Sequence, residues 1–235
     1  FAVEAAQNYP YDVPNVAVDY RREEIGINVG YWRSVSHALN CFTAESFMDE
    51  LAHAARQDPY EFRRNLLGKQ PRFRRALEET AAMAGWGNAP SGRYQGIALM
   101  EGYGTYLAQV AEVSVAGGRL QVHRICCAVD CGRMVNPAIV ESQIESGIVF
   151  GLTAALWGEI TLEGGRAQQA NFDSYRLLRL NEMPAIEVKL LESAEAPGGV
   201  GEPSTALVAP AVCNAIYAAT GRRLRELPIA KALRT

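Results

Sequence analysis

The chain has 235 residues, enough for one large domain or two domains of ordinary size. Hydrophobic residues make up 49% and charged residues 21%, the proportions of a globular protein with a substantial core. The formal net charge is −3 and no run of five like charges occurs, so we expect no nucleic-acid binding through a basic patch. No uninterrupted stretch of eighteen apolar residues occurs, so we expect no membrane span.

The chain begins at Phe1 rather than at Met, and the residues that follow do not have the pattern of a signal peptide. We therefore expect a part of a longer polypeptide, with any targeting signal upstream. The cellular compartment, cytoplasmic or periplasmic, does not follow from this stretch of sequence.

The chain has five cysteines but no Cys-x-x-Cys pair, so the spacings of zinc ribbons and iron–sulfur clusters are absent. The usual burial of free cysteine predicts reduced thiols in the core. The three histidines, His37, His53 and His123, lack metal-ligand spacing, and we expect structural roles for them. No side chain is therefore predicted to ligate a metal.

The first part of the chain is predicted to be mostly helical. Residues 1–30 indicate loops with one or two strands, because alternating runs such as residues 15–20 are broken by proline and glycine. Asp58 followed by Pro59 is a helix start signal. Apolar residues at helical spacing predict three helices, over residues 43–57, 59–68 and 71–85.

Beyond about residue 90 the apolar pattern changes to a period of two. It predicts two strands joined by a tight turn at Gly117-Gly118. The elements expected in this part are strands 106–115 and 120–129, a helix from Asn136-Pro137 to about 156, strands 158–162 and 186–191, and a helix over 204–220. This mixture predicts an α+β fold of mixed sheets with packed helices, divided loosely into residues 1–90 and 91–235.

The stretch Gly198-Gly199-Val200-Gly201-Glu202-Pro203 carries the most information about chemistry. Three glycines in four residues allow close backbone approach, which can bring main-chain N–H groups against a cofactor. Glu202 stands at a helix entrance, where the helix dipole favours a charged carboxylate and burial disfavours it, as suits a general base. The alternative is that Glu202 only caps the helix. The spacing excludes the dinucleotide-binding pattern Gly-x-Gly-x-x-Gly.

Four blocks, in chain order, carry a resemblance to a known family: Tyr31-Trp32-Arg33-Ser34 with the helix from Glu45 to Ala52; Ala111 to Val115; Ala128 to Gly132 with Asn136-Pro137 and residues 143–147; and Gly199 to Pro203 with the alanine-rich residues 209–216. They resemble the C-terminal part of the large subunit of molybdenum hydroxylases of the xanthine oxidase/aldehyde oxidase family. The Trp-Arg-Ser order is similar to the isoquinoline 1-oxidoreductase branch and its aldehyde-dehydrogenase-like relatives. The wider family has glycine where Ser34 stands, and its Gly-Gln-Gly loop is absent here and would lie upstream.

The resemblance implies a molybdenum-cofactor-binding domain in which Glu202 is the active-site base. The arginine loop, Trp32, Arg33 and Ser34, would contact the cofactor. The N–H groups of Gly199, Val200 and Gly201 would do the same. The pterin holds the metal in this family, so the resemblance implies no protein ligand to it.

Some of these positions have alternatives. Arg33 could instead form a structural ion pair with Glu45 or Glu50. The aromatic residues Trp32, Tyr103 and Tyr106 could line a pocket for a flat substrate or belong to the core.

By the same resemblance, the reaction would oxidise an N-heteroaromatic compound such as isoquinoline, or an aldehyde, with water as the oxygen source. The cofactor would be molybdenum–molybdopterin cytosine dinucleotide, and the partners a small subunit with [2Fe–2S] clusters and the upstream part of the same subunit. The alternatives are a non-catalytic interaction or assembly module descended from this fold, or an inactive fragment without the upstream cofactor loops.

Overall fold

The structure is a computed structural model, and it describes residues 2–233. Its helices are α1 (His37–Ala54), α2 (Pro59–Leu66), α3 (Pro71–Ala84), α4 (Pro137–Trp157), α5 (Pro203–Ala206), α6 (Val208–Thr220) and α7 (Ile229–Ala232), with a 3-10 turn at Leu180–Glu182. Its strands are β1 (Tyr94–Gly102), β2 (Thr105–Ala116), β3 (Arg119–Asp130), β4 (Leu162–Glu163), β5 (Arg166–Ala167) and β6 (Ala185–Leu190). The predicted mixture of helices and sheets is confirmed.

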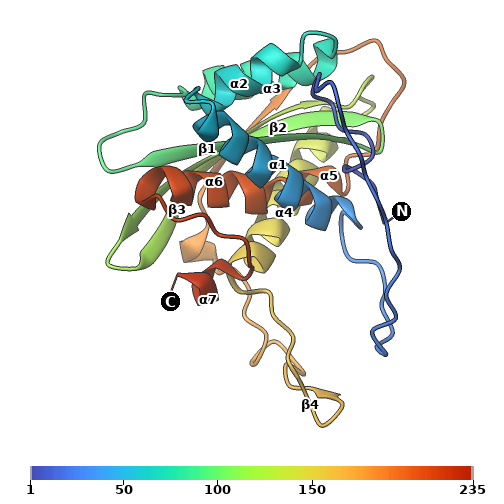
Figure 1. Ribbon diagram of the computed structural model, residues 1–235, viewed down its shortest axis with the longest axis vertical. Coiled ribbons are helices and arrows are strands. Elements are labelled where there is room, and N and C mark those ends of the chain that lie inside the picture. Colours follow the sequence, from blue (N-terminus) through green and yellow to red (C-terminus); the bar gives the residue numbers. More distant parts are fainter. Residues whose placement is uncertain (1, 234–235) are drawn as a thin grey trace.

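A four-stranded mixed sheet in the order β1-β2-β3-β6 forms the centre of the fold. The pairs β1–β2 and β2–β3 are antiparallel, whereas β6 runs parallel to β3 and follows α4. Alternate side chains of a strand point to opposite faces, so Ile97 and Leu99 pack in one core cluster with α3 while Ala98 and Met100 pack in the other with α4 and α6. Helices thus cover both faces of the sheet (Figure 1).

Several predicted elements are confirmed by their local chemistry. Asp58 accepts hydrogen bonds from the backbone N–H groups of Tyr60 and Glu61 at the start of α2. Asn136 does the same for Ile139 at the start of α4. The turn between β2 and β3 has positive φ at Gly117 and Gly118, as the expected tight hairpin requires.

Other expectations were wrong for reasons of packing. Residues 15–20 form no strand, because no neighbouring strand pairs with them, and Val16, Val18 and Tyr20 are exposed. Strand β1 was not predicted, because both of its faces are buried and its sequence has no alternation. The strand expected over residues 158–162 shortens to Leu162–Glu163, and the last helix divides at Leu207 into α5 and α6.

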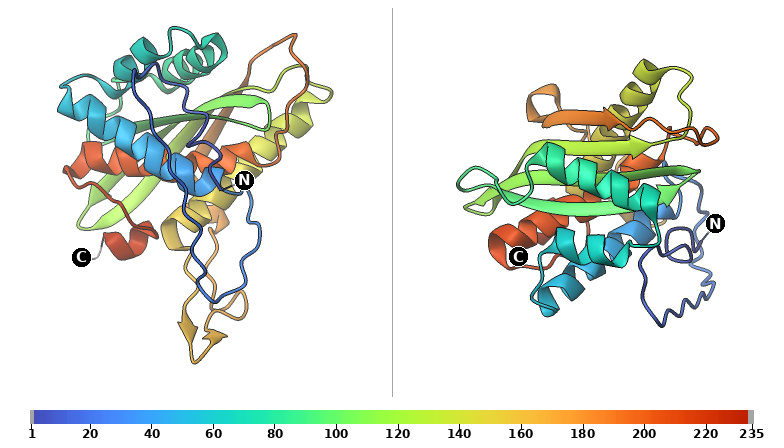
Figure 2. Two further views of the ribbon diagram at one scale, coloured as in Figure 1. Left: turned by 45° about the vertical axis from the view of Figure 1, so that its right-hand side comes forward. Right: turned by 90° about the horizontal axis from the view of Figure 1, so that it is seen from above.

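Two segments project from this body in the same direction, residues 15–31 and residues 158–180, which include the β4–β5 hairpin (Figure 2). The projecting residues include many exposed apolar side chains, among them Val29, Tyr31 and Phe172. The division expected near residue 90 stays a prediction.

Helix α4 meets the length and composition criterion for a membrane span, with a mean hydropathy of 1.2 over a window that is 44% buried. The sequence has no uninterrupted run of eighteen apolar residues, and for that reason no membrane span is expected. The mean hydropathy of a window can still reach the criterion when some of its residues are polar, as in α4. Core helices meet the same criterion. Here Ile144, Ile148 and Leu152 are fully buried in the cluster that joins α4 to α6 and the sheet. The apolar residues of α4 therefore pack in the core of this fold.

Candidate functional site

Three segments that are far apart in sequence meet around the carboxylate of Glu202. Its Oε2 accepts a hydrogen bond from the backbone N–H of Ser34 at 2.9 Å. The same oxygen accepts a second hydrogen bond from the phenol of Tyr103 at 3.0 Å. Ser34 belongs to the turn before α1, Tyr103 to the turn between β1 and β2, and Glu202 to the glycine-rich loop before α5. The carboxylate therefore ties together three parts of the fold.

The second oxygen of Glu202, Oε1, has no hydrogen-bond partner within residues 2–233. The side chain does not cap α5, so the capping alternative for Glu202 is wrong. Helix α5 packs tightly on α4. Gly147 of α4 lies so close to Ser204 of α5 that a Cβ at Gly147 would lie 2.0 Å from Oγ of Ser204. Gln109 of β2 also donates to the Ser204 carbonyl at 2.7 Å. These contacts fix the position of α5 and therefore the position of Glu202, which directly precedes it.

Arg33 anchors the glycine-rich loop to α4. Its Nε donates to the Gly201 carbonyl at 2.7 Å, and its Nη1 donates to Oγ of Ser146 at 2.9 Å. Its Nη2 lies 3.3 Å from Oε1 of Gln143. Partial burial lowers the pKa of Arg33, and the negative charge of Glu202 acts in the opposite direction.

The structural ion pair considered for Arg33 does not form. Glu45 pairs with Arg63, and Glu50 pairs with Arg225. Arg33 instead belongs to the site with Glu202.

The first two glycines of the loop, Gly198 and Gly199, lie against the turn between β1 and β2. A Cβ at Gly198 would lie 2.6 Å from the Gly104 carbonyl, so the loop and the β1–β2 turn can approach only without a side chain there. The N–H of Gly199 donates to the Tyr103 carbonyl at 2.8 Å, so the expectation that this group faces a cofactor was wrong. Gly198 and Gly199 therefore lie close to residues 103–105 at the turn between β1 and β2.

Val200 and Gly201 differ from the two preceding glycines. Their N–H groups have no acceptor among the described residues. A Cβ at Gly201 would meet only Oε1 of Gln143 at 3.8 Å, an ordinary contact distance. No steric reason for glycine at this position lies within residues 2–233. The free N–H groups and the open space beside Glu202 fit a group bound against the loop.

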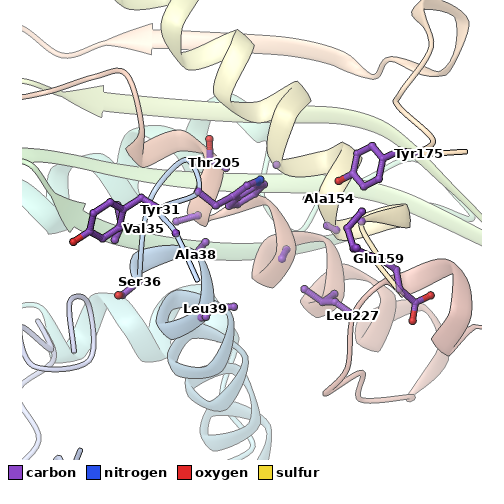
Figure 3. A pocket seen from close by; sticks show the side chains of 18 of the residues that line it. Tyr31, Val35, Ser36, Ala38, Leu39, Ala154, Glu159, Tyr175, Thr205 and Leu227 are labelled. Atoms are coloured by element: carbon purple, nitrogen blue, oxygen red, sulfur yellow. The ribbon is translucent and has the colours of Figure 1, made fainter. Parts of the chain in front are cut away.

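Trp32 lines a mostly apolar cavity of about 700 Å³ next to this site. Its ring stacks on Phe150 of α4, with ring centroids 5.0 Å apart. Tyr175 and Thr205 also line the cavity, which lies between α1, α4 and α6 (Figure 3). Glu202 does not line this cavity, but Thr205, three residues further along, does.

Of the remaining aromatic and titratable candidates, some lie at the site around Glu202 and others lie away from it. Tyr103 contacts Glu202, whereas Tyr106 packs edge-on against Phe73 and away from the site. Of the two alternatives for Tyr106, the structure therefore supports the core. His53 lies 3.4 Å from Asp49.

The other two histidines also have local partners, since His37 lies 3.6 Å from Glu4 and His123 lies 2.7 Å from Ser114. All five cysteines are buried and free. Residues 2–233 contain no cluster of three or more acidic, histidine or cysteine side chains that could hold a metal ion.

Sequence reasoning missed the partners that orient the site. Gln143 and Ser146 lie in one of the four blocks but had no assigned role, and only the fold shows that they hold Arg33. For Tyr103 the sequence indicates only a pocket or a core position. A signal for it exists, because a tyrosine between Gly102 and Gly104 stands at a tight turn where small residues are usual.

The chain is similar to known proteins over most of its length. Residues 22–184 match the family described as molybdopterin cofactor-binding domain. The chain is 35% identical over 229 residues to the beta subunit of isoquinoline 1-oxidoreductase from Brevundimonas diminuta, covering 95% of this chain and 29% of that protein. It is 33% identical to a nicotinate dehydrogenase subunit of Pseudomonas putida, covering 94% of this chain and 20% of that protein. The chain therefore spans less than a third of these relatives.

The fold is also found in solved structures of two aldehyde oxidoreductases. The aldehyde oxidoreductase from Desulfovibrio desulfuricans superimposes with a TM-score of 0.71 at 15% identity, covering 86% of this chain and 41% of that one. The aldehyde oxidoreductase from Desulfovibrio gigas gives a TM-score of 0.63 at 14% identity, covering 87% of this chain and 42% of that one. From the matched residues, the chain belongs to the molybdopterin cofactor-binding domain family.

Proposed function

We propose that this chain is the part of a molybdenum-cofactor-dependent hydroxylase subunit that supplies the catalytic base, Glu202. The observation that carries the proposal is the state of its carboxylate. One oxygen is held by Ser34 and Tyr103, and the other is free of protein partners among the described residues, at a half-buried position. A base needs this combination, because it must be fixed in place and still accept a proton.

The glycine-rich loop is suited to hold the cofactor beside this base. Val200 and Gly201 offer two successive N–H groups that no described residue accepts, and Gly201 leaves space for a bound group. Arg33 would act mainly by holding the Gly201 carbonyl, which sets the direction of the loop. Ser34 would act through its backbone N–H on Glu202. When bound, the molybdenum cofactor would supply the redox centre of the reaction.

Residues of this chain would then carry out the proton transfer. Glu202 in its carboxylate form would take a proton from the water-derived oxygen, while Ser34 and Tyr103 would keep it from rotating. The stacked rings of Trp32 and Phe150 would form an aromatic wall on one side of the region.

The substrate class is an N-heteroaromatic compound such as isoquinoline, or an aldehyde. The names of the relatives support this class, since they include an isoquinoline oxidoreductase, a nicotinate dehydrogenase and a membrane-bound aldehyde dehydrogenase named for pyrroloquinoline quinone. The apolar cavity beside Trp32 would suit a flat ring.

The proposal includes the cytosine dinucleotide form of the cofactor and a separate small subunit with [2Fe–2S] clusters. This chain has no Cys-x-x-Cys spacing, so the iron–sulfur clusters of the proposal would lie outside it. The upstream part of the same large subunit would complete the cofactor site, because the relatives extend well beyond the region matched here.

A non-catalytic module or an inactive fragment is the second candidate. Such a protein would have no chemical need for a carboxylate with one held oxygen and one free oxygen. The contacts of Glu202 with Ser34 and Tyr103 therefore favour the catalytic function.

The test is Glu202→Gln in the full-length subunit assembled with its partner. We expect turnover to fall by at least about 100-fold, the lower end of general-base contributions, with molybdenum content unchanged. Glu163→Gln, at an exposed position of the β4–β5 hairpin, is the matched control and should keep full turnover. Turnover of the Glu202→Gln enzyme near the wild-type rate would refute the proposed base.

A further inference from the structure

Unusual backbone conformations gather around Glu202. Among residues 2–233, five residues other than glycine have positive φ. Three of them, Ser34, Val35 and Tyr103, lie in the two turns that hold the carboxylate, with φ of 80°, 48° and 59°. A β-branched residue such as Val35 rarely adopts this conformation. Left-handed residues persist only where the surrounding structure holds them, and they often mark functional sites.

The turn that carries Tyr103 can be compared with two others in the same chain. All three join antiparallel strands through two residues of positive φ, the mark of a type I′ turn. The other two use Gly117-Gly118 and Gly164-Gly165, which adopt this conformation without strain. Among these three, the β1–β2 turn alone places a large side chain, Tyr103, at the first central position. The turn itself does not need a tyrosine, so the reason lies in what its side chain contacts.

The Tyr103 side chain contacts the carboxylate directly. Its phenol donates to Oε2 of Glu202 at 3.0 Å, and its ring lies 5.1 Å from the ring of His37. Its backbone carbonyl also receives the N–H of Gly199, so one residue fixes both the glycine-rich loop and the carboxylate that the loop carries.

We propose that Tyr103 is a positioning residue that holds Oε2 of Glu202, so that Oε1 is the oxygen that accepts the proton during turnover. The inference rests on the proposed function, because it assumes that Glu202 is the base. In the step, the carboxylate becomes a carboxylic acid at Oε1 by taking the proton of the water-derived oxygen, while both donors to Oε2 stay in place. The strained turns before α1 and between β1 and β2 keep those donors aimed at one oxygen.

The charges around this pair are compatible with a phenol that stays protonated. Burial, followed by the hydrogen bond to Glu202 and its charge, raises the pKa of Tyr103, and Glu4 and Cys41 act in the same direction. Arg33 is the positively charged group that interacts with the carboxylate, and His37 is the titratable group next to the phenol ring. Tyr103 therefore remains a donor over the working pH range.

The experiment compares three variants of the full-length subunit in its complex. Tyr103→Phe keeps the ring and removes only the hydroxyl. Tyr103→Asn places a residue that type I′ turns favour at the strained position and also removes the donor. Tyr106→Phe is the matched control, because Tyr106 lies three residues away and its ring packs on Phe73 rather than toward Glu202.

Each enzyme is assayed for kcat and KM over a range of pH and for its thermal midpoint. The reactivity of Glu202 toward a water-soluble carbodiimide is measured by mass spectrometry, and this readout does not depend on activity. We expect both Tyr103 variants to lose roughly tenfold in kcat with KM unchanged, the size expected for one hydrogen bond to a charged group. The acid limb of kcat/KM should move to higher pH, and labelling of Glu202 should be several-fold faster. Tyr106→Phe should match wild type in all of these.

Unchanged kcat and labelling in Tyr103→Phe would overturn the proposal. Losses of kcat that only follow a lowered thermal midpoint, with no change in the pH profile or labelling, would also overturn it in favour of a purely structural role. If Glu202→Gln keeps its turnover, the proposed function fails, but labelling of Tyr103→Phe still decides whether Tyr103 holds the carboxylate.

Discussion

Replacing Arg63 by methionine would test how much a buried ionic cluster contributes to this fold. Arg63 is 0% exposed, and its Nε donates to Oε2 of Glu45, itself 3% exposed, at 3.0 Å. Its other nitrogens donate to the backbone carbonyls of Pro59 and Glu45 at 3.1 and 2.7 Å. Tyr11 donates to the second oxygen of Glu45 at 2.8 Å. The cluster therefore joins α2, α1 and the N-terminal segment.

The expected loss follows from the charge that would be left behind. Methionine fills much of the volume of arginine, so the main effect is that Glu45 stays buried without its cation, with Asp49 nearby, 2% exposed. Removing one partner of a buried ion pair destabilises a protein by about 3–5 kcal/mol. At about 2–4 °C per kcal/mol for a chain of this size, the thermal midpoint should fall by roughly 6–20 °C.

The assay is thermal unfolding of the 235-residue chain followed by circular dichroism. The control is Arg64→Met at the next position of α2, where the side chains of the ion pair with Glu78 are 35% and 37% exposed, so that its loss should matter less. The double variant Glu45→Gln/Arg63→Met should recover part of the loss, because the unpaired charge is gone. Equal shifts for Arg63→Met and Arg64→Met would refute the reasoning.

Three further predictions concern packing, titration and capping. Gly96→Ala should unfold at lower temperature than wild type, because its Cβ would lie 2.1 Å from the backbone nitrogen of Ala215, and a midpoint equal to wild type would contradict this close contact. Glu202→Gln should lower the pKa of Tyr103, which is raised first by burial and then by Glu202, so phenolate should form at lower pH in NMR of 13C-labelled tyrosine. Asp58→Ala should lose about 1 kcal/mol in denaturant unfolding, because two N–H groups at the start of α2 lose their acceptor, and no change would show that water replaces the cap without cost.

The elements that could be predicted are those with local causes. Caps such as Asp58 and Asn136, the Gly117-Gly118 turn and the alternation of β2 and β3 depend on neighbouring residues, and the sequence contains all of them. Strand β1 depends on burial of both faces by α3 and α6. Such burial replaces alternation by a continuous apolar run that has no period to detect.

The opposite error occurred in residues 15–20. Their alternation is typical of a strand, but a strand exists only when its N–H and C=O groups meet a neighbouring ladder, and none of the described residues provides one. A local pattern therefore predicts the capacity to form a strand and not the pairing itself.

The sequence by itself determined the family, through four ordered blocks, and placed Arg33 and Glu202 in two of them. Only the tertiary structure decided which groups these residues contact. In the folded chain Arg33 donates to the Gly201 carbonyl, and the N–H of Gly199 donates to the Tyr103 carbonyl. The phenol of Tyr103 donates to the carboxylate of Glu202. The physical reason is that a hydrogen bond requires donor and acceptor within about 3 Å, and 99 residues of chain separate Tyr103 from Glu202 until the sheet and α5 pack together.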